Sequence, residues 1–182
     1  MAELAPTPPH TAVPLTRALA EDYATELASL ASLIPLVEYT AEDVVSEQKG
    51  ERMLSNKWLH SLIIIEDSKP IAFVMAYERQ SEENAQYPDN TLYISELAVA
   101  ETHWHQGIAQ SLLQQFFERN NELGFRTLSG AFNYSIQTNS ADWNKHVISL
   151  YESFGFKQRA IKPYPNRTDV VLGVGVDGLK LR

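Results

Sequence analysis

One stretch of the sequence restricts the possible folds more than any other, because it places a strand pattern directly before a helix pattern. Leu92–Ala100 is mostly apolar and contains β-branched residues, as strands do. A polar turn, Glu101–Gln106, follows, and from Gly107 to about Leu123 apolar residues recur at the spacing of an amphipathic helix. A strand that leads through a short turn into a helix predicts helices packed against a sheet.

The other patterns extend this unit into a mixed sheet with helices on its faces, an α/β fold of mixed α+β type. Thr40 is a candidate N-cap, Gly124 a candidate C-cap, and Asp67–Pro70 is turn chemistry between two strands of a hairpin. Polar loops are expected at 80–90 and 133–139. We expect strands at 13–18, 62–66, 71–79, 92–100, 127–132, 156–162 and 169–176, and helices at 21–36, 40–54, 107–123 and 141–154.

The composition excludes several classes of function. The chain has 182 residues, and we expect a flexible, proline-rich lead at 1–12 before a single domain at 13–182. It has no cysteine, which excludes disulfides, thiolate metal sites and a cysteine nucleophile. A formal charge of −8 argues against nucleic-acid binding, and it fits either a cationic acceptor or solubility alone. No apolar run approaches the roughly 20 residues of a membrane span and no signal peptide is evident, so we expect a cytoplasmic protein without membrane contact.

The glycine that opens the expected helix suggests an anion site. Unpaired N–H groups and the positive end of the helix dipole suit a phosphate, and Gly107 has no Cβ to keep a ligand away from the backbone. The alternative is a strand-to-helix turn that merely needs a glycine. Neither G-x-G-x-x-G nor G-x-x-x-x-G-K-[ST] is present, which argues against a dinucleotide site or a P-loop.

Two segments resemble the hallmark motifs of GNAT acetyltransferases. Tyr93–Val99, followed by Trp104-His-Gln-Gly-Ile-Ala109, is similar to that family's strand and its [Arg/Gln]-x-x-Gly-x-[Gly/Ala] loop, although Trp104 stands where Arg or Gln is usual. Asn144–Phe156 is similar to Asn-x-x-Ala-x-x-Leu-Tyr-x-x-x-Gly-Phe, with Val147 in place of Ala. The resemblance covers roughly Val13 to Val176 and implies a GNAT-type fold whose central mixed sheet is mostly antiparallel.

The resemblance implies acetyl-coenzyme A as cosubstrate and no metal. In this family the loop amides take the pyrophosphate, and strand backbone and an asparagine hold the pantetheine arm. The residues that it assigns to acetyl-coenzyme A are Leu97, Ala98, Val99, Trp104, His105, Gln106, Gly107, Ile108, Ala109, Gln110, Asn144 and Tyr151. The side chains of Leu97–Val99 are expected in the core in either case, because only their backbone would bind the cosubstrate. The alternative for Asn144 is a helix N-cap or a surface amide.

Two side chains are candidates for proton transfer. Glu96 could take the proton of an alkylammonium, whose pKa is about 10.4, or could simply lie in an ion pair or on an exposed face. His103 and His105 are competing bases, although histidines in a surface turn are usually only solvated. Tyr151 could protonate the departing thiolate, or could be a packing residue at helical spacing.

The favoured hypothesis is an N-acetyltransferase that moves acetyl from acetyl-coenzyme A directly to a primary amine of a small molecule or peptide. A non-catalytic acyl-coenzyme A sensor, which the anomaly at Trp104 would fit, and a ligand-free interaction domain remain alternatives. Homodimers are common among resembling proteins, so a homodimer stays open. In this fold the acceptor usually meets the segments that correspond to 33–56, 80–90 and 162–169, where Glu38, Tyr39, Glu42 and Tyr87 would suit a cationic or aromatic amine.

Overall fold

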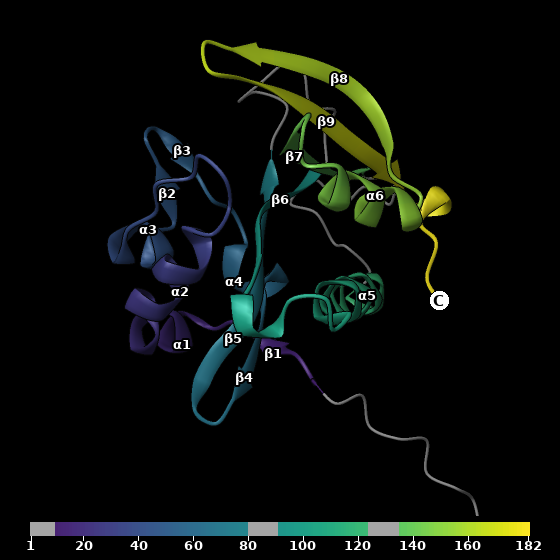
Figure 1. The fold of residues 1–182 in the computed structure, drawn as a ribbon. Coiled ribbons are helices and arrows are strands. Elements are labelled where there is room, and N and C mark those ends of the chain that lie inside the picture. Colours follow the sequence, from purple (N-terminus) through teal and green to yellow (C-terminus); the bar gives the residue numbers. More distant parts are fainter. Residues whose placement is uncertain (1–9, 80–90, 124–134) are drawn as a thin grey trace, which may run out of the picture.

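The computed structural model describes residues 10–79, 91–123 and 135–182 and folds them around one seven-stranded sheet (Figure 1). The sheet has the order β1-β4-β5-β6-β7-β9-β8. Only the β6–β7 pair is parallel among these strands, and every other neighbouring pair is antiparallel. The expected α/β class, with a mixed, mostly antiparallel sheet between helices, is confirmed. The strands are β1 (Val13–Pro14), β4 (Leu62–Glu66), β5 (Lys69–Arg79), β6 (Thr91–Val99), β7 (Ser135–Ala141), β8 (Lys157–Tyr164) and β9 (Arg167–Gly175).

Helices cover both faces of the sheet (Figure 1). One face packs under α5 (Ile108–Glu122) and α6 (Lys145–Ser153), where alternate strand residues such as Val74 and Ile94 meet Leu113 and Phe116. The other face packs under α1 (Arg17–Asp22), α2 (Ala24–Ala31) and α3 (Ala41–Val45). The short helix α4 (Lys57–His60) precedes β4, and two three-residue 3₁₀ turns lie at Glu101–His103 and Val176–Gly178.

The expectation of a single helix from Thr40 to about Leu54 is wrong. The Thr40 side chain does cap a helix, and Asp43 completes a reciprocal capping box, but α3 stops at Val45. A small hairpin, β2 (Gln48–Lys49) and β3 (Arg52–Met53), takes up the rest, and Gly50 in its turn has a φ of +61°. The helix already ends at Ser46, whose ψ of 137° is extended, and Gly50 with its positive φ could not belong to a right-handed helix.

Other boundaries also differ from expectation, and α2 (Ala24–Ala31) in particular ends five residues before the expected end at residue 36. The strand at 13–18 is only Val13–Pro14, because Thr16 caps α1. The helix at 21–36 is split into α1 and α2 by Tyr23, whose φ of −113° is not helical. The loop at 133–139 is wrong from residue 135 onward, where β7 begins, and α6 therefore starts at Lys145 and not at 141. The strand at 127–132, the loop at 80–90, Tyr87 and the cap at Gly124 lie outside the described residues.

Candidate active site

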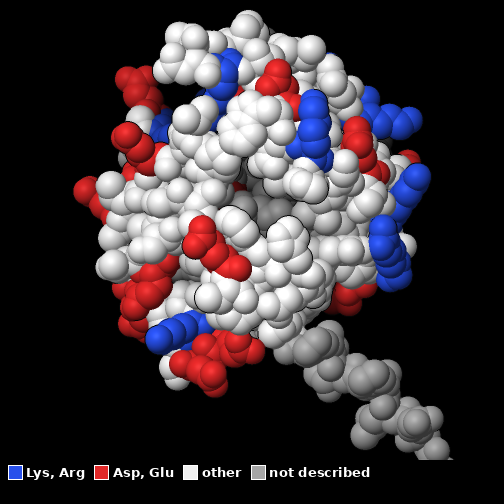
Figure 2. All heavy atoms as spheres, in the orientation of Figure 1, with Lys and Arg blue, Asp and Glu red and all other residues white. Residues whose placement is uncertain are grey.

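Strands β6 and β7 run side by side for four residue pairs and then separate. Their pairing begins at Thr91 with Ser135 and ends at Ile94 with Thr138, while β6 continues to Val99. The Thr138 hydroxyl donates to the carbonyl of Ile94 at 3.0 Å, at the last pair before the gap. Between Ser95 and Val99, β6 therefore has no strand partner on this edge among the described residues. Figure 2 shows a hollow at the centre of this face of the molecule, ringed mostly by uncharged residues.

A β-bulge in β6 lies at the same place. Met75 of β5 pairs with Glu96 and Ala76 pairs with Ile94, so Ser95 is the extra residue, and its hydroxyl oxygen lies 3.2 Å from the Met75 carbonyl oxygen. The bulge interrupts the alternation of side chains. Ile94 and Leu97 therefore both pack toward α5, and Ala98 packs in the opposite core, under α1–α3.

Glu96 is a buried carboxyl on the α3 side of the sheet, with 8% of its surface exposed. The Ser95 hydroxyl donates a hydrogen bond to its Oε2. Burial raises the pKa of Glu96, while the Ser95 hydrogen bond and the charges of Lys49 and Lys57 oppose the rise. A carboxyl with a raised pKa accepts a proton more readily at neutral pH, which is what proton abstraction from an ammonium requires.

Tyr39 lies beside this carboxyl. Its hydroxyl donates to the thioether sulfur of Met75 at 3.5 Å. Burial, and then the charge of Glu96, raise the pKa of Tyr39, so the phenol stays neutral. Glu96, which is buried, and Tyr39, which is partly buried, are therefore both polar side chains on the α3 side of the sheet.

Tyr151 of α6 lies on the opposite side of the sheet, in the core with α5, and its surface is 2% exposed. Its ring centroid is 5.1 Å from that of Phe156, so the side chain does pack as a core residue. It also shares a hydrogen bond with Thr138, which brings the phenol to the point where β6 and β7 separate. Burial raises the pKa of Tyr151, and the phenol therefore keeps its proton and remains a donor.

The loop before α5 presents unpaired backbone donors. Gly107 is the N-cap with a φ of +76°, and the first helical hydrogen bond runs from the Ser111 N–H to its carbonyl at 2.9 Å. The N–H groups of residues 108–110 therefore have no acceptor within the helix. A Cβ added to Gly107 would meet nothing within 4 Å, so the space in front of this glycine is open. His105 and Gln106 are exposed beside it, and Ile108 is a core side chain.

Trp104, the residue that departs from the family motif, has a defined contact. Its indole N–H donates to the carbonyl of Val99 at 2.7 Å, while 46% of the residue stays exposed. Trp104 thus caps the end of β6 and ties the loop to it. One of the backbone acceptors expected for the pantetheine arm is therefore already in contact with a protein donor.

Two further predicted residues, Asn144 and His103, differ in whether their side chains already have a hydrogen-bond partner among the described residues. Asn144 is the N-cap of α6, yet its side chain makes no capping hydrogen bond. His103 is held at the surface by Glu66, with 2.8 Å between Nε2 and Oε2, so it is engaged away from Glu96. Ser95, Thr138 and Lys57 were not predicted: Ser95 and Thr138 carry no signal that separates them from ordinary strand residues, and Lys57 has the pattern of an exposed helix residue.

No group of three or more His, Cys, Asp or Glu side chains is arranged to hold a metal ion in 10–79, 91–123 or 135–182. Within the same ranges, no helix has the length and apolar character needed to cross a membrane.

The model of the acetyltransferase (GNAT) family matches residues 24–156, well over half of the chain. No curated protein matches the sequence. Among solved structures, the ribosomal-protein-S18-alanine N-acetyltransferase from Escherichia coli is 14% identical with a TM-score of 0.64, over 92% of this chain and 94% of that one.

Two further structures show the same fold. The NatC complex bound to Gag peptide and CoA is 18% identical with a TM-score of 0.66, over 91% of this chain and 97% of that one. Arabidopsis thaliana NAA60 in complex with a bisubstrate analogue is 16% identical with a TM-score of 0.65, over 93% and 99%. At these identities the likeness is one of fold.

Proposed function

The chain belongs to the acetyltransferase (GNAT) family, and from that membership we propose that it transfers an acetyl group from acetyl-coenzyme A directly to a primary amine of a small molecule or peptide. The observation that carries the proposal is the gap between β6 and β7. It has a buried carboxyl, Glu96, on one side of the sheet and a buried phenol, Tyr151, on the other.

The proposed binding of acetyl-coenzyme A uses the backbone. The open space at Gly107 and the N–H groups of residues 108–110 suit the pyrophosphate, because they combine unpaired donors with the positive end of the α5 dipole. The unpaired edge of β6 from Ser95 to Val99 suits the amides of the pantetheine arm, which can pair with it as a strand would. Asn144, with a side chain that caps nothing, is the proposed amide contact from α6.

The proposed chemistry needs three proton transfers. The Glu96 carboxylate takes a proton from the acceptor ammonium, directly or through a water, and the free amine attacks the thioester carbonyl. The nitrogen–carbon bond forms, the carbon–sulfur bond breaks, and the hydroxyl of Tyr151 gives its proton to the departing thiolate. The acylated nitrogen then loses its second proton, which returns through water to the tyrosinate and restores the phenol. The acceptor approaches from the α3 side, where Tyr39 and Glu96 lie, and the thioester from the α5 side.

A second candidate is an acyl-coenzyme A sensor without turnover. The contact between the Trp104 indole and the Val99 carbonyl favours it, because it occupies a group that the pantetheine arm would use. A carbonyl oxygen has two lone pairs, however, and can accept a second hydrogen bond. Both Glu96 and Tyr151 are present, and a sensor would need neither.

Two measurements on the purified protein test the proposal. Acetyl-coenzyme A at about 100 times its Kd should stabilise the fold by about 2.7 kcal/mol and raise the Tm accordingly. A panel of amines at fixed acetyl-coenzyme A, read by thiol release, should contain acceptors that are acetylated. A Tm shift without turnover of any amine would favour the sensor, and no Tm shift at saturation would remove the cosubstrate from the proposal.

A further inference from the structure

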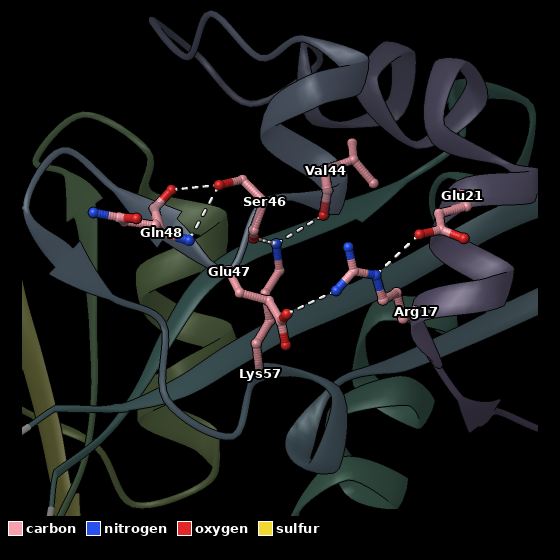
Figure 3. A network of polar contacts seen from close by, with 7 residues as sticks. All are labelled: Arg17, Glu21, Val44, Ser46, Glu47, Gln48 and Lys57. Carbon is pink, nitrogen blue, oxygen red and sulfur yellow. Dashed lines mark hydrogen bonds and ion pairs between the residues drawn. The ribbon is translucent and has the colours of Figure 1, made fainter.

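Lys57, the first residue of α4, is a buried cation that the proposed chemistry does not use. Its surface is 1% exposed. Its ammonium donates to the carbonyl oxygens of Ser46 at 2.6 Å, Val44 at 2.7 Å and Asp43 at 3.4 Å, as Figure 3 shows for the two shorter contacts. Val44 and Asp43 belong to the end of α3, where carbonyl groups lack helical partners and the dipole favours a cation.

Burying the Lys57 ammonium among these carbonyl groups reduces the stability of the folded protein. All three partners are neutral carbonyls, and no carboxylate lies within ion-pair distance of Lys57 in the described residues. Burial lowers the pKa of Lys57 to about 8, against the opposing charges of Glu96, Glu47 and Asp43. Because the unfolded chain holds this proton more tightly, the cost is present below pH 8 and is relieved as the pH rises from there toward the ordinary lysine value. An apolar side chain would avoid the cost, which points to a use for the charge.

The contacts of α4 and α3 place this charge near Glu96. The Ser61 hydroxyl, at the end of α4, donates to the Lys57 carbonyl at 2.7 Å and accepts from the Ala76 N–H at 3.2 Å. Ala76 follows Met75, which is the β5 partner of Glu96 at the bulge. Tyr39, just before α3, contacts the same Met75. Lys57 therefore binds the end of the segment 39–46, and Tyr39, at the start of that segment, contacts Met75. Helix α4, which carries Lys57, is itself bound to β5 at Ala76, next to Met75.

We propose that Lys57 is a positioning residue for the acceptor side of the site: its buried ammonium fixes the α3 segment over Glu96, and its positive charge keeps the Glu96 carboxylate ionised and ready to accept a proton. This rests on the proposed function, in which Glu96 is the base. The ammonium reaches neither the acceptor nor acetyl-coenzyme A, since its three donors are used on carbonyl groups.

Two other charged residues, Lys49 and Asp43, also act on Glu96 and have to be distinguished from Lys57. Lys49 of β2, an exposed residue, acts on the carboxyl with the same sign, while Asp43 of α3 acts against it. Lys49 faces solvent, so salt should screen its effect, whereas the effect of buried Lys57 should persist in salt. On the exposed side of the same segment, Arg17 forms ion pairs with Glu47 at 3.1 Å and with Glu21 at 2.9 Å (Figure 3). Arg17 holds the same segment from its exposed surface, which makes Arg17→Gln the matched control.

The experiment measures the Glu96 titration directly. Carboxyl ¹³C NMR, with the Glu96 signal assigned by its loss in Glu96→Gln, gives the carboxyl pKa in the wild type, Lys57→Gln, Lys57→Met, Lys49→Gln and Arg17→Gln. Lys57→Gln keeps a hydrogen-bond donor for the carbonyls but has no charge, and Lys57→Met removes both. The pH dependence of kcat/KM for the best acceptor is measured in parallel.

The proposal expects the Glu96 pKa to rise by about half a unit or more in both Lys57 variants, at low and at 0.5 M salt. The acid limb of kcat/KM should move to higher pH by the same amount, and Arg17→Gln should move neither. A Glu96 titration unchanged in folded Lys57→Gln, or an equal shift in Arg17→Gln, would overturn it. Failure of both Lys57 variants to fold would also overturn it, because Lys57 would then be a structural residue. If no amine is acetylated, the proposed function fails, yet the NMR titration still decides the role of Lys57.

Discussion

Replacing Tyr151 with phenylalanine removes one hydroxyl from the proposed site and leaves a buried ring in place. The ring is packed 5.1 Å from Phe156, centroid to centroid, and that packing does not depend on the hydroxyl. Thr138 keeps its own hydrogen bond to the Ile94 carbonyl at 3.0 Å. The expected loss of folding free energy is therefore about 1 kcal/mol, the net contribution of one neutral hydrogen bond.

The expected effect on the rate is larger. A positioned general acid typically contributes about 10²- to 10⁴-fold. A thiol with a pKa of about 8.5 is already a good leaving group, so the lower end applies. We expect kcat to fall by about 100-fold, which corresponds to about 2.7 kcal/mol in the barrier. The Kd of acetyl-coenzyme A should change by less than about threefold, because the hydroxyl acts on the departing sulfur and does not anchor the ligand.

The assay follows thiol release with the best acceptor from the amine panel, and calorimetry gives the Kd. Burial raises the pKa of Tyr151, so the phenol keeps its proton and the loss should be constant from about pH 6 to pH 9. Tyr23→Phe, the same chemical change at the junction of α1 and α2, is the control and should leave kcat unaltered. An unchanged kcat in folded Tyr151→Phe would refute the acid role, and a parallel loss of affinity and rate would make Tyr151 a binding residue.

The other predictions concern the base and the phosphate loop. Because burial raises the pKa of Glu96, its carboxylate costs stability in full above that raised pKa, and the cost is lost as the pH falls from there to the ordinary glutamate pKa. Glu96→Gln should therefore raise the Tm at pH 7, with a gain that shrinks toward acid pH. The same variant should lower kcat/KM by about 100-fold or more. A Tm that is lower at pH 7 would contradict this linkage. Gly107→Val and Gly50→Val force valine into positive φ in open space, at +76° and +61°, and should cost similar stability. Only Gly107→Val should weaken acetyl-coenzyme A binding, by about tenfold; equal Kd values in calorimetry would mean that the phosphate loop is misplaced.

Sequence patterns correctly predicted those elements whose structure depends mainly on residues within the element itself. The strand at 62–66 coincides with β4, and the helix at 107–123 differs from α5 by one residue at each end. In the strand a run of apolar residues, and in the helix their regular spacing, ends at turn or capping residues. The residues of each segment are therefore enough to predict it. Thr40 is of the same kind, because its capping box with Asp43 joins residues three apart.

Strand β7 could not be predicted in this way. Ser135–Ala141 is polar and has no apolar alternation, and its place depends on β6 and β9, which are distant in sequence. One of its buried polar side chains, Thr138, is hydrogen-bonded to the neighbouring strand through the Ile94 carbonyl. The bulge at Ser95 has the same origin, since it is a property of the β5–β6 register and not of the serine.

Only those site residues that lie in or next to the family motifs could be predicted from the sequence. Glu96 and Tyr151 lie in or beside the two motifs and were singled out from the sequence. Lys57 was not, because a lysine in a polar stretch is normally solvated and only the path of the chain from Asp43 to Ser46 buries it. Trp104 departs from the motif, and the reason for its contact with Val99 is visible only when the strand end and the loop are seen together.

Two buried side chains of the proposed site that can carry a charge, Glu96 and Lys57, lie near each other. Glu96 and Lys57 are both buried, each in a form that burial disfavours, and the charge of each reduces the other's penalty. Removing either one therefore leaves the other less favourable, so the effects of Glu96→Gln and Lys57→Met on the free energy of unfolding should not add. If the charges act on each other as the acceptor side of the site requires, the double variant is more stable than the sum of the single variants indicates. Simple additivity would mean that the two charges are independent, and Lys57 would then have no effect on the base.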